Sequence, residues 1–249
     1  MTYPTRFPSP TEHVPYAYVP GLAAIPALTA VLAAVLAARL AGSVVRRPSV
    51  ARALWAAGLA AFGIAAAAEA YGEADGYGVA AFKVYYLAGG CLAVALLGAG
   101  SLWRVLGSQQ RPALAGALCV ALPAAAISII VAETDQALLA GATSGGPPVN
   151  AALQGHAFLW AIALNTLGTL ALLGVALAGF RDPARRRAMA FVLAGLACTA
   201  GSGAMTRFGS YGYVYATQAV GLVLLAVGFE LLERRPGLAR RRSLGVRAA

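Results

Sequence analysis

Seven long apolar runs constrain this chain more than any other feature. They fall near residues 20–42, 53–71, 79–106, 113–131, 152–180, 188–206 and 213–232. Each could form a helix of about 20 residues, the length needed to cross a bilayer core of about 30 Å. The runs are continuously apolar, whereas barrel strands alternate in polarity over about ten residues. With 60% hydrophobic and 11% charged residues, the chain is predicted to be an all-α, polytopic membrane protein whose seven-helix transmembrane domain covers 20–232.

The arginines predict the orientation of these helices. When successive loops are assigned alternately to two sides, sixteen of the nineteen Lys and Arg residues fall on one side, and only Arg6, Lys83 and Arg207 fall on the other. The positive-inside rule then gives an outside N-terminus and an inside C-terminus. We expect residues 1–19, rich in proline, to form an extended outer segment. We expect 233–249 to form a basic cytoplasmic tail that could bind anionic lipids, so the charge of +10 indicates topology and no nucleic-acid partner.

An internal similarity predicts a repeat. The basic turn at 46–52, after the first span, resembles the turn at 181–187 at an offset of 135. Tyr, Leu, Gly and Arg positions of the third span recur in the seventh span at an offset of 130. We therefore predict a parallel repeat of spans one to three and five to seven, with the fourth span as connector, a 3+1+3 arrangement.

A short, acidic, tyrosine-rich turn between the second and third spans carries the only lysine of the chain. Glu69 and Lys83 each lie within about one helical turn of a span edge, where a charge is costly unless it is paired or faces a cavity. The two residues could form a structural ion pair or a functional site. Together with Tyr86, His156 and Arg207 they are the candidate outward-facing ligand-binding residues. The alternatives are an interfacial hydrogen-bonding role for His156 and a snorkelling Arg207.

A second polar group lies at mid-depth. Asn165 and Thr169 in the fifth span, joined by Gln218 in the seventh, could hold helices together or form a midplane transport site. The chain has no phosphate-binding glycine loop, no HExxH and no Cys or His spacing typical of a metal site. Its three cysteines are interpreted as small apolar residues. We therefore expect no cofactor and no metal, and an enzyme is not the favoured interpretation.

Short motifs carry a family resemblance. The segments 85–89, 97–100, 165–169 and 207–209 resemble a family of uncharacterised bacterial seven-helix membrane proteins, over roughly 50–232. This resemblance implies a bacterial cytoplasmic (inner) membrane and no particular activity. The 3+1+3 architecture is similar to that of SWEET sugar transporters and microbial rhodopsins. The chain lacks the Pro-Gln loop motif of the former and the Schiff-base lysine of the latter.

The leading functional hypothesis is a ligand-binding or sensory module that binds a small molecule at its outer face and signals through a protein partner. The alternatives are a small-molecule transporter built on the repeat, an intramembrane enzyme, and a purely structural membrane protein. A continuous cavity from the outer residues to Asn165 would favour transport, and a sealed core beneath a shallow outer pocket would favour sensing.

Overall fold

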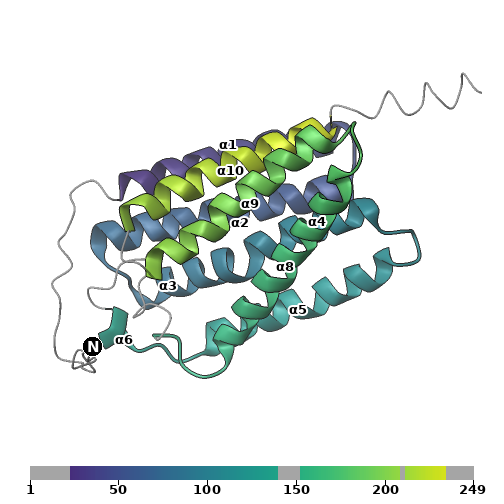
Figure 1. Ribbon diagram of the computed structural model, residues 1–249. Coiled ribbons are helices and arrows are strands. Elements are labelled where there is room, and N and C mark those ends of the chain that lie inside the picture. The colour runs from purple at the N-terminus through teal and green to yellow at the C-terminus, as the bar shows by residue number, and fades with distance from the viewer. Residues whose placement is uncertain (1–22, 140–151, 208–210, 234–249) are drawn as a thin grey trace, which may run out of the picture.

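The computed structural model describes residues 23–139, 152–207 and 211–233, without the side chains of 202–207, 211–212 and 233. Within these ranges the only β structure is one isolated bridge between Thr134 and Leu153, and the helices form one bundle (Figure 1). The helices are α1 (Ala24–Arg46), α2 (Val50–Asp75), α3 (Val79–Tyr85), the π-helix η1 (Tyr86–Ala93), α4 (Val94–Val105), α5 (Arg111–Val131), α6 (Gln136–Leu139), α8 (Ala157–Phe180), α9 (Arg186–Arg207) and α10 (Tyr211–Glu233).

Among the residues that the structure describes, six helical segments are long and apolar enough to cross a membrane. They are Ala24–Arg46, Val50–Asp75, Val79–Val105, Arg111–Val131, Ala157–Phe180 and Tyr213–Leu232. Their outer faces expose large apolar side chains, among them Val120 at 71%, Ile127 at 62% and Leu167 at 64%. Soluble proteins seldom leave so much apolar surface in water, whereas lipid chains solvate it without cost. The prediction of an all-helical, multi-pass membrane protein is therefore confirmed.

The sixth predicted span, 188–206, corresponds to α9, a helix of 22 residues that runs along α10. A Cβ on Gly195 would lie 2.7 Å from the carbonyl oxygen of Gly221, so the two backbones nearly touch. Gly195 and Thr199 of α9 both face Gly221 of α10, and such small side chains let helices approach closely. The crossing of the membrane by α9 and the orientation of the bundle remain predictions.

The fifth predicted span began too early. The apolar pattern predicts its start at 152, but α8 begins at Ala157. Ala152 and Leu153 are apolar because they are buried beside α6, and not because they belong to a span. The backbone N–H of Asp135 donates to the carbonyl of Ala152 at 2.9 Å, which ties this stretch to the segment after α5. The predicted segments 1–19 and 233–249 lie outside the described residues, apart from residue 233, whose backbone ends α10.

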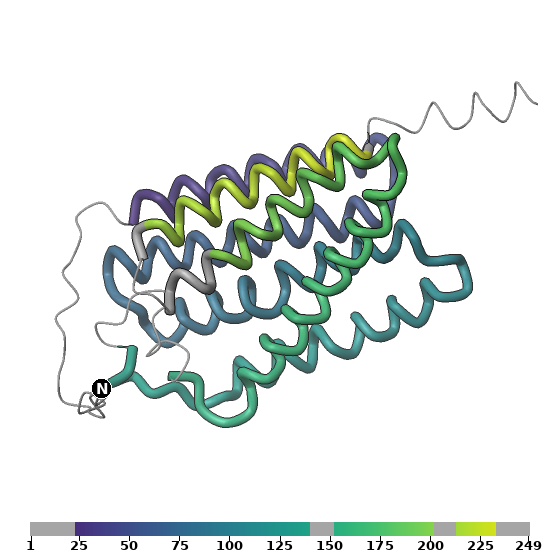
Figure 2. Tube along the Cα trace, viewed as in Figure 1, coloured from purple at the N-terminus to yellow at the C-terminus, as the bar shows by residue number. Residues whose placement is uncertain are grey.

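The long helices other than α5 pack as two groups. One group runs from α1 to α4 and the other from α8 to α10. Helix α1 packs against α2, α9 packs against α10, and α4 lies between α2 and α8. Helix α5 contacts mainly η1 and α8, and it lies on the opposite side of the bundle from α1 (Figure 2). A Cβ on Gly98 of α4 would lie 2.5 Å from the carbonyl oxygen of Gly168 of α8, so glycine is required where these two helices cross. This crossing joins the two groups.

The third predicted span is one continuous helical segment with a π-helical middle. Helix η1 covers eight residues between α3 and α4. A π-helix closes i to i+5 hydrogen bonds, which widens the helix, and such segments are frequent at functional sites. The widened section contains Gly89 and Gly90, whose missing side chains let it lie close to α2 and α8. The sequence predicted the span but not this change of helix type.

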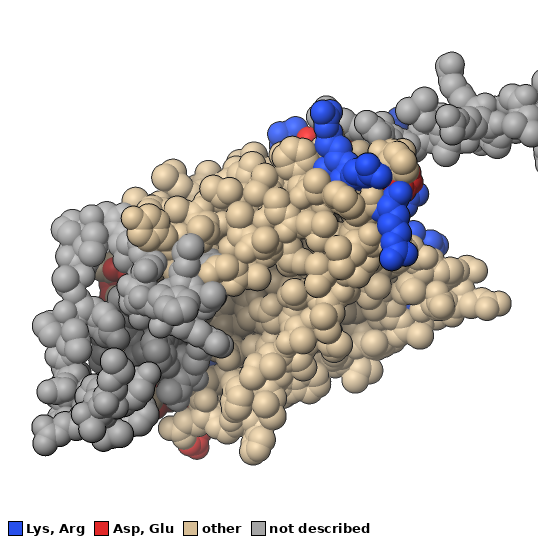
Figure 3. Space-filling view, in the orientation of Figure 1, with Lys and Arg blue, Asp and Glu red and all other residues tan. Residues whose placement is uncertain are grey.

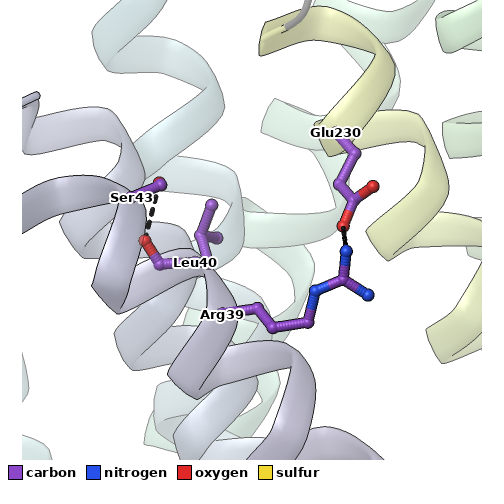
Figure 4. A network of polar contacts seen from close by, with 4 residues as sticks. All are labelled: Arg39, Leu40, Ser43 and Glu230. Atoms are coloured by element: carbon purple, nitrogen blue, oxygen red, sulfur yellow. Dashed lines mark hydrogen bonds and ion pairs between the residues drawn. The ribbon is translucent and has the colours of Figure 1, made fainter. Parts of the chain in front are cut away.

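Charged side chains separate to the two ends of the bundle. The arginines whose side chains are described gather where α1, α4 and α8 end and where α2, α5 and α9 begin, and we call this the basic end (Figure 3). The opposite end, which we call the acidic end, carries Glu73, Asp75, Glu133 and Asp135. At the basic end Arg39 forms an ion pair of 3.1 Å with Glu230, which connects α1 to α10 (Figure 4).

Candidate functional site

A cavity of about 640 Å³ lies inside the bundle. Its walls come from α2, α3, η1, α4, α8, α9 and α10, so both groups of helices contribute to it. Most of its lining is apolar, as expected of a membrane bundle. Its polar lining consists of Glu69, Tyr85, Tyr86, Asn165, Thr166, Thr169, Thr199 and Gln218.

The cavity joins two sets of residues that the sequence placed apart. Glu69 and Tyr86, predicted for an outer site, share its walls with Asn165, Thr169 and Gln218, predicted for a polar patch at mid-depth. The residues that line a single cavity therefore extend from near the acidic end to near the midpoint of α8. This is the arrangement that distinguishes a deep binding site from a shallow outer pocket.

Glu69 is the charged residue of this cavity within the described part of the chain. It lies on the buried face of α2, one turn beyond Ala65 and Ala66, which also line the cavity, and only 4% of its surface is exposed. A carboxyl group so deeply placed requires polar surroundings, since burial in an apolar medium is costly. The nearby tyrosines and the open cavity supply such surroundings.

Helix α8 supplies the polar wall opposite α2. Asn165 and Thr169 are one helical turn apart and therefore project from the same face. The hydroxyl of Thr169 donates to Oδ1 of Asn165 at 3.4 Å, a long hydrogen bond that leaves most of the amide available. Gln218 of α10 completes this wall. These side chains can both donate and accept hydrogen bonds.

Helix η1 forms the wall between α2 and α8. Gly89 and Gly90 line the cavity, and a Cβ on them would lie 3.0 Å from Cβ of Ala65 and 3.2 Å from Cβ of Ala161, respectively. Larger residues here would push the helices apart or fill the cavity. These glycines are not among the site residues predicted from the sequence, although a Gly-Gly pair in the middle of a span is a usable signal.

Lys83 does not contribute to the cavity. Its Nζ donates two hydrogen bonds of 2.7 Å, to the carbonyl oxygens of Ile130 and Ala132 at the end of α5. Among the described side chains it forms no ion pair with Glu69, which lies in the cavity wall instead. The terminal carbonyls of a helix lack partners within the helix and attract a cation. The structure therefore does not support the predicted pair of Glu69 and Lys83, either as a structural ion pair or as a functional site.

Of the other two outer candidates, His156 does not line the cavity, and the side chain of Arg207 is not described. His156 is the residue before α8; its imidazole is exposed and its carbonyl accepts from the N–H of Leu159 at 3.0 Å. Arg207 is the last residue of α9, and its side chain lies outside the described residues. A polar contact between α2 and α10 at the acidic end comes from Tyr215, whose hydroxyl donates to Oε1 of Glu73 at 2.6 Å.

The cavity ends on a packed cluster toward the basic end. We call Trp55, Leu172, Val192, Leu196 and Phe229 the barrier cluster; all are at most 8% exposed. The rings of Trp55 and Phe229 stack with centroids 4.5 Å apart, and Nε1 of Trp55 donates to the hydroxyl of Ser101 at 3.2 Å. Leu196 also lines the cavity, so the cluster forms its floor.

A second, smaller cavity of about 150 Å³ lies on the other side of the barrier cluster. Trp55, Leu172, Val192 and Phe229 line it, together with Arg104 and other residues of the basic end. The large cavity borders α8 from Ala161 to Leu170, and the small one borders α8 from Leu172 onward. The two cavities thus follow one another along α8 with the barrier cluster between them.

In the described ranges, no group of three or more His, Cys, Asp or Glu residues is placed to hold a metal ion. Cys91 is buried, Cys119 is exposed and Cys198 is intermediate; all three are free thiols. In comparisons with protein-family models, with curated proteins and with solved structures, nothing matches the chain.

Proposed function

We propose that this protein is a membrane carrier of a small molecule that binds in the large cavity. The observation that carries the proposal is the single cavity whose walls join Glu69 and Tyr86 to Asn165, Thr169 and Gln218. Its volume of about 640 Å³ lies within the range of roughly 300–1,000 Å³ typical of small-molecule sites. Polar side chains inside a membrane bundle are costly, and they commonly mark a solute pathway.

The position of the two cavities supports carriage over simple binding. A carrier exposes one site alternately to the two sides of the membrane, and a packed barrier closes one side at a time. The barrier cluster closes the large cavity toward the basic end, where the small cavity begins. In the proposed arrangement α9 also crosses the membrane, as the sixth of seven spans, and the arginine-rich basic end faces the cytoplasm. The parallel repeat would then place the site between its two halves.

A sensory role is the second candidate, and the same barrier cluster favours it. Five residues that are at most 8% exposed close the cavity floor, which would suit a receptor that binds from one side and passes a change in packing to a partner protein. In that case the floor never opens. The two candidate functions therefore differ in whether the cavity is ever reached from the basic end.

Thiol labelling from each side separates the two. In a background with Cys91, Cys119 and Cys198 replaced by Ala, Thr169→Cys places a thiol in the large cavity and Val175→Cys places one in the small cavity. A membrane-impermeant thiol reagent is applied to vesicles of each orientation. A carrier should show Thr169→Cys reacting from both sides, while a receptor should show reaction from the acidic end only. Val175→Cys serves as the control for access from the basic end.

A further inference from the structure

Helices α9 and α10 pack against each other more closely than either packs against the rest of the bundle. Their backbones meet at two levels. A Cβ on Gly195 of α9 would lie 2.7 Å from the carbonyl oxygen of Gly221 of α10. A Cβ on Gly228 of α10 would lie 3.0 Å from the carbonyl oxygen of Ala188 of α9. Close-packed backbones do not slide past each other without losing these contacts, so α9 and α10 act as one rigid unit, which we call the pair.

The other helices that surround the cavities form a second unit, which we call the frame: α1, α2, α3, η1, α4 and α8. A Cβ on Gly58 of α2 would lie 2.9 Å from the carbonyl oxygen of Ala93 of η1. A Cβ on Gly168 of α8 would lie 2.5 Å from the carbonyl oxygen of Val94 of α4. Helix α8 is therefore fixed to the frame, although the predicted repeat would group it with α9 and α10.

The frame and the pair meet through side chains near the basic end. A Cβ on Gly179 of α8 would lie 3.0 Å from Cγ of Met189 of α9. The ring of Phe229 of α10 stacks on the ring of Trp55 of α2. Apolar side chains can part and repack at a lower cost than two backbones in contact, so the boundary between frame and pair is the place where the bundle can move.

Both cavities lie at this boundary. The pair lines the large cavity with Leu196, Thr199, Ala200 and Gln218. It lines the small cavity with Met189, Val192, Phe229 and Leu232. The frame supplies most of the remaining lining of both. A movement of the pair therefore changes access to both cavities at once.

Two polar contacts join α10 to the frame at opposite ends. Near the basic end Glu230 forms its ion pair of 3.1 Å with Arg39 of α1 (Figure 4). Near the acidic end the hydroxyl of Tyr215 donates to Oε1 of Glu73 of α2 at 2.6 Å. Tyr215 and Glu230 are 15 residues apart, or about 22 Å along the helix. Phe229 precedes Glu230, so the segment of α10 that carries the ion pair also closes the barrier cluster.

We infer that the pair rocks against the frame and that the two polar contacts are latches. The ion pair between Arg39 and Glu230, the basic latch, holds the basic end shut. The hydrogen bond from Tyr215 to Glu73, the acidic latch, holds the acidic end shut. Release of the basic latch lets the end of α10 leave the barrier cluster and joins the two cavities. This inference rests on the proposed carrier function and identifies the unit whose movement exposes the site.

The rates at which Thr169→Cys reacts with a membrane-impermeant thiol reagent from each side of the vesicle test the latches. A substitution that weakens one latch shifts the population toward the state in which that latch is open. Arg39→Gln removes the basic latch and should raise the ratio of the rate from the basic end to the rate from the acidic end about two- to fivefold. Tyr215→Phe removes the acidic latch and should lower this ratio about threefold. The double variant should lie between the two.

Each latch variant has a matched control on the same helix. Arg46 of α1 is exposed and forms no hydrogen bond or ion pair in the described part of the chain. Arg46→Gln therefore removes the same charge from the basic end and leaves the basic latch intact. Tyr213 of α10 is 71% exposed, and Tyr213→Phe removes a hydroxyl without touching the acidic latch. Both controls should keep the rate ratio of the parent protein.

Distances between spin labels show which unit moves. In the background without native cysteines, labels on Leu177 of α8 and Val223 of α10 span the boundary, whereas labels on Leu177 and Val50 of α2 both lie on the frame. These three residues are 53%, 40% and 49% exposed, respectively. Between Arg39→Gln and Tyr215→Phe, the distance distribution from Leu177 to Val223 should shift, and that from Leu177 to Val50 should not. The reverse result would mean that α8 moves with the pair, and would overturn the inference.

The rates also separate a failure of the latches from a failure of the carrier function. If Thr169→Cys reacts from both sides but Arg39→Gln and Tyr215→Phe leave the ratio unchanged, or move it in the same direction, the carrier function stands and the latches are wrong. If Thr169→Cys reacts from the acidic end only, in the parent background and in both variants, the carrier function itself is contradicted.

Discussion

Lys83 offers the sharpest test of the packing of α5. Its ammonium group donates to the carbonyls of Ile130 and Ala132, each at 2.7 Å. Helix α5 has few other contacts with the bundle, chiefly with η1 and α8. Substituting Lys83→Met keeps the length of the side chain and removes both hydrogen bonds together with the charge at the helix C-terminus. We therefore expect α5 to dock less firmly.

The size of the effect follows from the two hydrogen bonds. A hydrogen bond from a charged donor contributes about 1.5–3 kcal/mol in soluble proteins, whereas side-chain hydrogen bonds in membrane bundles average about 0.6 kcal/mol. The side chain of Lys83 is partly exposed and the bond to Ile130 is at the surface, so water can replace part of what is lost. A loss of about 1–3 kcal/mol in the free energy of unfolding is expected from these limits.

Unfolding in detergent measures this loss, with Lys83→Arg as the matched control because arginine can still donate to both carbonyls. The Glu69→Lys/Lys83→Glu double variant distinguishes the present contact from an ion pair. An ion pair would be restored by exchanging the charges, but a carboxylate at position 83 would face two carbonyl oxygens and would repel them. Recovery of stability in the double variant, or a Lys83→Met variant as stable as the parent protein, would contradict a stabilising contact between Lys83 and the end of α5.

Three further substitutions test other parts of the structure. Gly98→Val should lower the free energy of unfolding by about 1–3 kcal/mol through overpacking, because a Cβ there would lie 2.5 Å from the carbonyl oxygen of Gly168. The control is Gly174→Val, where a Cβ meets no other atom within 4 Å, and this variant should unfold like the parent protein in the same assay. Arg39→Gln should change the stability by no more than about 1 kcal/mol, since the side chains of its ion pair with Glu230 are 64% and 38% exposed; a larger loss in a detergent melt would contradict a screened surface pair. Leu172→Ser, in the barrier cluster, should let glycerol enter vesicles that contain the protein, which light scattering detects as faster swelling. Swelling as slow as that of vesicles with the parent protein would show that the cluster is not the barrier.

The helices could be predicted from the sequence because lipid imposes a simple rule. Every span must be long and apolar. The predicted span 53–71 accordingly lies within α2, and the predicted span 213–232 lies within α10. The error at 152 has a physical cause. Ala152 and Leu153 are apolar and buried, but they are buried beside α6 by a tertiary contact that composition does not distinguish from a membrane span.

The polar residues of α8 in the candidate site could also be predicted, whereas the hydrogen bonds of Lys83 and the role of Gly89 and Gly90 could not. Asn165 and Thr169 are one turn apart in an apolar run, so their shared face is evident from spacing alone. The partner of Lys83 could not be predicted, because backbone carbonyls at the end of a helix have no residue signature. The contribution of Gly89 and Gly90 depends on the π-helical geometry of η1, which the apolar pattern does not determine.

The proposed function depends on a cavity that reaches the midpoint of α8. Its most direct test is the reaction rate of Thr169→Cys with a small water-soluble thiol reagent, compared with that of Leu167→Cys. Thr169 lines the cavity, whereas Leu167 is 64% exposed toward the lipid and does not line it. Because the reactive species is the thiolate, which forms only where water or polar groups are near, Thr169→Cys should react about tenfold faster or more. Equal and slow rates for both thiols would contradict the cavity and the proposals that depend on it.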